Sequence, residues 1–122
     1  MYRKILTAVD GSQAAWRALE SALDLASRHR AELHVIPVLG PVPSNASIHG
    51  TADSEAARAL AKEAVHRAAV MGKEIQLDPA GAENVQALLL HAAEHRFDLL
   101  AVGGPNDEVT LGTIPVALLM VP

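Results

Sequence analysis

The sequence predicts an α/β fold: a three-layer α/β/α arrangement around an open, mainly parallel five-stranded sheet of order 3-2-1-4-5. Apolar runs of strand length alternate along the chain with segments whose apolar residues recur at helical spacing, as they do in doubly wound sheets. The first and fourth runs are almost continuously apolar, which is typical of parallel strands covered on both faces. Right-handed crossovers, with the winding reversing between the first and fourth strands, give that strand order.

The first strand runs from Ile5 to Val9, and Asp10, Gly11 and Ser12 follow it directly. Ligands of open α/β sheets bind just beyond the carboxyl ends of strands, which makes Asp10 the first candidate for a binding residue. Ser12 can cap the next helix by accepting a hydrogen bond from a free amide of its first turn. A plain strand-to-helix turn would use the same three residues, so both interpretations stay open.

An amphipathic helix is expected from Gln13 to Arg28. Its apolar face consists of Ala15, Trp16, Leu19, Ala22, Leu23 and Ala26. Because Trp16 continues the row of Leu19 and Leu23, we expect it to pack on the sheet rather than stack on a ligand. Leu33 to Val38 is the second strand, in which His34 is expected to be a satisfied or half-exposed histidine.

A long loop from Pro37 to Ala52 contains three prolines and two glycines, and loops of this length are usually functional or disordered. Asp53 or Ser54 can cap a second helix, which Gly72 ends. Its apolar face is expected to comprise Ala57, Leu60, Ala61, Ala64, Val65 and Ala68. Polar and apolar residues alternate from Lys73 to Asp78, which predicts an edge strand with Ile75 and Leu77 pointing inward.

The last third of the chain supplies a third helix and two strands. The helix is expected from Glu83 to Arg96, with Val85, Leu88, Leu89 and Ala92 facing inward. Asp98 to Gly103 is the central fourth strand, and Val116 to Val121 is the fifth. This order places Asp10 and Gly103 opposite each other across the crevice where the winding reverses.

The composition of the chain limits the classes of protein to which it can belong. The chain of 122 residues is expected to form one domain, residues 1–122, with half its residues hydrophobic. A net charge of -4 and single Phe, Tyr and Trp residues argue against nucleic acid as a partner. The absence of cysteine removes disulfides and thiolate chemistry. No secretion signal or membrane span is recognisable, so we expect a soluble, intracellular protein with no membrane partner.

Several motifs, present or absent, bear on the chemistry that the chain could carry out. Glycines in the run from Gly103 to Asp107 could let backbone amides approach a phosphate, although a plain turn is the favoured explanation when this run is taken alone. The fingerprints of P-loop and dinucleotide-binding proteins are absent. His91 and His95 match a zinc-peptidase pattern, but a hydrolytic zinc site needs a third protein ligand, for which few residues remain. With no nucleophile elbow either, we expect no enzymatic activity.

Several segments together resemble the universal stress proteins of the A type. They are the opening residues 2–12, the helical residues 17–20, the strand residues 31–35, the run 97–103 and the closing strand 114–122. The resemblance covers nearly the whole chain. It implies a cytoplasmic dimer with a flavodoxin-like or adenine nucleotide α-hydrolase-like arrangement.

One branch of that family binds ATP through an aspartate after the first strand and a G-x-x-G-x(9)-G-[ST] motif after the fourth. Asp10 matches the aspartate and Gly103 the first glycine, while Asn106 stands at the second glycine position. The next Gly-Thr pair, Gly112 and Thr113, follows after five residues where nine are expected. The motif is broken twice, and the helix that normally precedes the closing strand is essentially absent.

The resemblance implies a non-enzymatic, dimeric stress-response module that binds a regulatory protein partner or a small ligand, with weak or no ATP binding. The alternative is a sensor of adenine nucleotides, ATP or AMP, in the crevice of Asp10 and Gly103, with Asn106, Gly112 and Thr113 toward the phosphates. No other cofactor and no metal are expected. A homodimer is expected through Val116 to Val121, because this apolar edge strand carries no charge that would discourage pairing.

Overall fold

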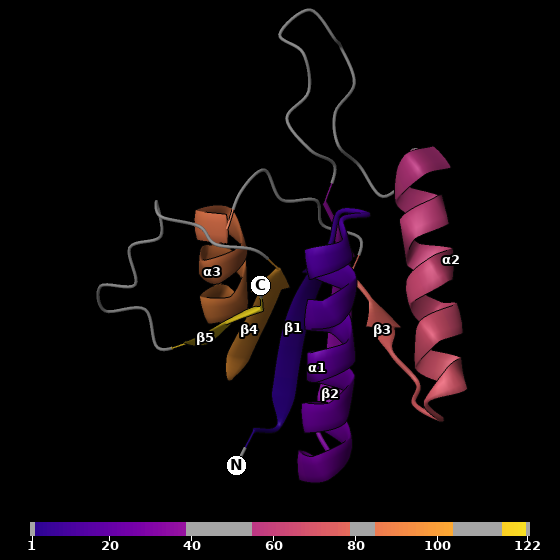
Figure 1. The fold of residues 1–122 in the computed structure, drawn as a ribbon. Coiled ribbons are helices and arrows are strands. Elements are labelled where there is room, and N and C mark those ends of the chain that lie inside the picture. The colour runs from indigo at the N-terminus through magenta and orange to yellow at the C-terminus, as the bar shows by residue number, and fades with distance from the viewer. Residues whose placement is uncertain (1, 39–54, 79–84, 104–115, 122) are drawn as a thin grey trace, which may run out of the picture.

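The computed structural model, which describes residues 2–38, 55–78, 85–103 and 116–121, contains one five-stranded sheet of order β3-β2-β1-β4-β5 (Figure 1). Every neighbouring pair in it is parallel. The strands are β1 (Lys4–Val9), β2 (Glu32–Pro37), β3 (Gln76–Leu77), β4 (Leu99–Gly103) and β5 (Ala117–Val121). The predicted fold class and strand order are therefore confirmed.

Helices cover both faces of the sheet. They are α1 (Gln13–His29), α2 (Glu55–Val70) and α3 (Val85–Glu94). One buried cluster joins α1 and α2 to one face, and a second joins α3 to the other. Alternate residues of β1 divide between them, Ile5 and Val9 facing α1 and Leu6 and Ala8 facing α3. Among the described helices, none has the length and apolarity needed to cross a bilayer.

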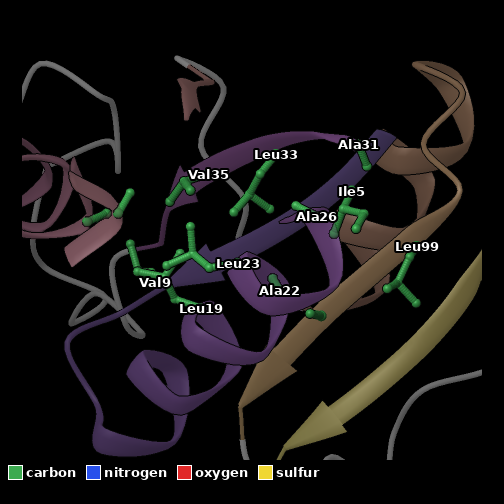
Figure 2. Close-up of a cluster of buried hydrophobic side chains, with 13 residues drawn as sticks. Ile5, Val9, Leu19, Ala22, Leu23, Ala26, Ala31, Leu33, Val35 and Leu99 are labelled. Atoms are coloured by element: carbon green, nitrogen blue, oxygen red, sulfur yellow. The ribbon is translucent and has the colours of Figure 1, made fainter. Parts of the chain in front are cut away.

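The first helix forms where the sequence predicts it. Ser12 is its N-cap, with Oγ accepting a hydrogen bond from the Ala15 amide at 3.1 Å, and Arg30 ends it in the left-handed conformation at φ 54°. Figure 2 shows the buried side chains of α1 lying against β1 and β2. Trp16 packs at the margin of this cluster. The Arg67 guanidinium lies over its ring, 4.5 Å from the ring centroid. The expected packing role of Trp16 is confirmed.

Three expectations for this half of the sheet and the helix that covers it were wrong. Val65 was placed on the buried face of α2, but it is 43% exposed, because Ala57, Ala64 and Ala68 form the buried row and Val65 lies beside it. The edge strand spans two residues rather than the six from Lys73 to Asp78. Ile75 packs on the core, whereas Leu77 is 46% exposed, since little of the described molecule lies outside this edge.

The opposite face is built around α3. Leu88, Leu89 and Ala92 are buried against strand residues of β1, β2 and β4, as predicted. The helix ends at Glu94, two residues before the expected end at Arg96. Arg96 takes a left-handed φ of 61°. In this conformation the Phe97 amide donates a hydrogen bond to the Ala92 carbonyl at 2.8 Å. This left-handed closure is a common way of ending a helix.

Candidate functional site

The candidate site lies where the winding of the sheet reverses. β1 pairs with β2 on one side and with β4 on the other, through Thr7 beside Ala101. The two strands are joined by a buried side chain as well, because the Thr7 hydroxyl donates to the Ala101 carbonyl at 2.8 Å. The carboxyl ends of β1 and β4 therefore open side by side at the position where ligands of such sheets bind.

Asp10 follows β1 at this position and is exposed. Its Oδ1 accepts a hydrogen bond from the Ser12 amide at 2.9 Å, which holds the carboxylate before the first turn of α1. Within the described residues, Oδ2 accepts no hydrogen bond. The carboxylate is thus fixed through one oxygen and offers the other to a hydroxyl or amino group of a ligand.

Gly11 makes the turn between Asp10 and the helix cap. Its φ of +89° lies in the region that favours glycine. Leu60 of α2 closes over it, since a Cβ on Gly11 would lie 3.4 Å from Leu60 Cδ2. The second helix therefore borders the crevice on the β2 side.

Gly103 ends β4 in a very different environment. A Cβ there would collide with the backbone of Ala14 and Ala15, because the first turn of α1 crosses directly over this residue. The sequence suggests that Gly103 belongs to a phosphate loop or to a turn. Neither interpretation included the packing of α1 against this glycine. No local signal could have shown it, since the contacting residues lie almost 90 positions earlier in the chain.

Of the five predicted site residues, Asp10 and Gly103 are placed by the structure, at the ends of neighbouring strands. Asn106, Gly112 and Thr113 lie outside the described residues.

The histidines of the apparent zinc pattern have other contacts. His91 Nε2 lies 2.8 Å from Asp78 Oδ2, and its ring centroid is 4.3 Å from that of His95. In the ranges that the structure describes, no group of three or more His, Asp or Glu side chains could hold a metal ion. The geometry of His91 is that of a link between the end of β3 and α3.

Sequence reasoning missed a pocket of about 400 Å³ between α2 and the carboxyl ends of β2 and β3. Its lining residues are Pro37, Ala57, Arg58, Ala61, Lys62, Leu77 and Asp78. The exposed Leu77 and the small residues on α2 were the available signal, but only the packing of α2 on the sheet brings them together.

Comparison with known proteins agrees with this architecture. The universal stress protein family matches residues 1–111. Universal stress protein YxiE of Bacillus subtilis (strain 168) is 29% identical over 132 aligned positions, covering 93% of this chain and 89% of that protein.

Solved structures of the same family superpose closely. A universal stress protein in complex with cAMP has a TM-score of 0.73 at 25% identity, with 99% of this chain and 97% of that chain covered. A family member from Burkholderia pseudomallei has a TM-score of 0.70 at 26% identity, with 99% and 96% covered. With a family match over most of its length and the same fold, this chain belongs to the universal stress protein family.

Proposed function

We propose that the chain is a non-enzymatic, dimeric stress-response module of the cytoplasm that binds an adenine nucleotide carrying a single phosphate. The proposed site is the crevice between Asp10 and Gly103, and ATP is expected to bind weakly or not at all. The observation that carries the proposal is the exposed Asp10 carboxylate, which is held at the switch point of the sheet with one oxygen free of described partners.

The nucleoside end of the ligand is assigned to Asp10. A carboxylate in this position can accept hydrogen bonds from ribose hydroxyls, as acidic residues of other doubly wound folds do. The relative of TM-score 0.73 was solved in complex with cAMP, which supports an adenine nucleotide with one phosphate as the class of ligand.

The residues expected to contact the phosphates of the ligand disfavour the binding of ATP. Gly103 packs against the backbone of the first turn of α1, so packing alone accounts for its lack of a side chain. Beyond it, Asn106 replaces a glycine of the family's ATP motif, and Gly112 and Thr113 follow too early. A cradle for three phosphates therefore lacks the residues that would form it, whereas a single phosphate needs fewer amides.

The proposed lack of turnover rests on the site chemistry. Asp10 serves as an acceptor for the ligand, and the described residues form no cluster suited to a metal ion that could activate water. We expect incubation with ATP or cAMP to release no product above the rate of a buffer control. Sustained hydrolysis that Asp10→Asn removes would contradict this part of the proposal.

The proposed dimer uses the edge of β5. In the described structure this strand hydrogen-bonds to β4, and Leu118, Leu119 and Met120 are half-buried apolar side chains. Among the described residues no strand pairs with its other edge, and sheet edges of this kind tend to pair with another chain, most often about a two-fold axis. Leu118→Lys or Met120→Lys should yield monomer or aggregate in sedimentation. A monomer of the unmodified chain at tens of micromolar would refute the dimer.

Calorimetric titration with cAMP, AMP and ATP tests the ligand. We expect a monophosphate to bind at least about tenfold more tightly than ATP, and Asp10→Asn to weaken it by at least about tenfold. Asp24→Asn is the matched control, since it removes the same charge from an exposed ion pair with Arg28 on α1. A low-micromolar dissociation constant for ATP would favour an ATP sensor instead, and binding of no adenine nucleotide would refute the assignment.

A further inference from the structure

We infer that the pocket between α2 and the ends of β2 and β3 is a second small-molecule site, for a monoanionic carboxylate with an apolar body. The site shares no residue with the nucleotide crevice, so the inference does not depend on the proposed function. It rests on the shape of the pocket, on two cations at its rim and on the sign of the charge around it.

The walls of the pocket are mainly apolar. Pro37 and Ala57 are buried, Ala61 is half-buried, and Leu77 exposes 46% of its surface. The volume of about 400 Å³ falls within the range of roughly 300–1,000 Å³ found for small-molecule sites. Leu77 is a large apolar side chain that the described part of the fold leaves uncovered, and a ligand with an apolar body would cover it.

Two cations stand at the rim. Arg58 and Lys62 are four residues apart on α2, so they project from the same face of the helix. Both are exposed, and neither makes an ion pair or side-chain hydrogen bond with a described residue.

This like-charged pair contrasts with two other helical pairs at the same spacing. Asp24 and Arg28 on α1 are 3.0 Å apart, and Glu63 and Arg67 on α2 are 2.9 Å apart. Each of those pairs joins opposite charges. Arg58 and Lys62 instead repel each other beside an apolar pocket, and an anionic group placed between them would relieve that repulsion.

Asp78 sets the charge of the ligand. Its side chain also lines the pocket, is 15% exposed and is held by His91 at 2.8 Å. One carboxylate against two cations leaves a formal charge of +1 on the three charged lining side chains, which matches a monoanion. A phosphate monoester, which carries up to two negative charges at neutral pH, would leave one negative charge unmatched beside the Asp78 carboxylate.

Leu60 separates this pocket from the crevice. It belongs to the same helix as Arg58 and Lys62 but lies over Gly11, whereas the pocket residues face the ends of β2 and β3. Ligands of the two sites therefore touch different sides of α2.

Calorimetric titration with octanoate, octanol and octyl phosphate tests the inference. We expect octanoate to bind one per chain with a dissociation constant below about 1 mM, at least about tenfold tighter than the other two. Arg58→Gln with Lys62→Gln should weaken octanoate by at least about tenfold. Arg3→Gln with Arg28→Gln, which removes the same charge elsewhere, should leave it unchanged.

Two further variants distinguish binding in this pocket from binding elsewhere on the chain. Ala61→Leu should fill the pocket and abolish octanoate binding while the circular dichroism spectrum stays native. Asp10→Asn should leave octanoate binding intact, whatever it does to nucleotides. No saturation up to about 5 mM octanoate, equal loss in the Arg3 and Arg28 control, tighter binding of octyl phosphate, or loss in Asp10→Asn would each overturn the inference.

Discussion

The carboxyl ends of β1 and β4 lie side by side, and each is marked by a glycine, but the two glycines meet different physical demands. Gly11 turns the chain at φ +89° with room for a Cβ beside Leu60. Gly103 has no such dihedral requirement, yet a Cβ on it would enter the backbone of α1. The β1 end thus presents a carboxylate to solvent, while the half-buried glycine at the β4 end is packed against the first turn of α1.

The difference shows why a glycine after a strand is a weak sign of a phosphate site. Gly103 would be required even if no ligand ever bound, because α1 could not otherwise reach β4. The case for a ligand therefore rests on Asp10. The carboxyl ends of β1 and β4 can be compared by substitutions that test, in turn, the space for a side chain, the backbone dihedral angle, the helix cap and the charge.

The largest effect is expected from Gly103→Ala. The added methyl group must displace the first turn of α1, and overpacking of this kind should lower the free energy of unfolding by about 3 kcal/mol. Urea denaturation measures the change. A loss below about 1 kcal/mol would mean that α1 moves away easily and that packing does not explain this glycine.

Gly11→Ala should cost less, about 1–2 kcal/mol, because the strain is confined to one positive φ and the methyl group meets Leu60 at an ordinary distance. Gly11→Asn is the control, since asparagine tolerates positive φ better than alanine. If Gly11→Ala proved more destabilising than Gly103→Ala, the assignment of the two glycines would have to be exchanged.

Ser12→Ala removes the N-cap of α1, whose Oγ accepts from the Ala15 amide. The expected loss is about 1 kcal/mol in thermal or urea unfolding. Ser12→Asp should retain most of the stability because its carboxylate can accept the same hydrogen bond. Equal losses in the two variants would show that the hydrogen bond from the Ala15 amide is not the source of the stabilisation.

The smallest effect on stability is expected from Asp10→Asn. The amide oxygen can still accept from the Ser12 amide, so only the charge near the N-terminus of α1 is lost, worth at most about 0.5 kcal/mol at an exposed position. Near-native stability combined with lost nucleotide binding would mark Asp10 as a ligand residue. A loss above about 2 kcal/mol would make it a structural one.

The sheet could be predicted because its strands and helices carry periodic apolar patterns, and both central strands lie within one or two residues of their expected positions. Asp10 could be placed because topology fixes where β1 ends. The role of Gly103 could not, since it depends on the distance between α1 and β4. Val65 and Leu77 were misassigned because alternation and helical spacing indicate which residues share a face, not how far the neighbouring layer extends.

The two edges of the sheet differ in length, and this has a consequence for native-state hydrogen exchange. β3 is paired to β2 through Gln76 and Leu77, whereas β5 is paired to β4 along five residues. A strand held by so few hydrogen bonds opens at a lower free energy than the central strands. Amide protons of β3 and of the adjoining turns of α2 should therefore exchange together, and faster than the rest, through local opening of this part of the molecule. Amide protons of β1 and β4 should exchange only through global unfolding.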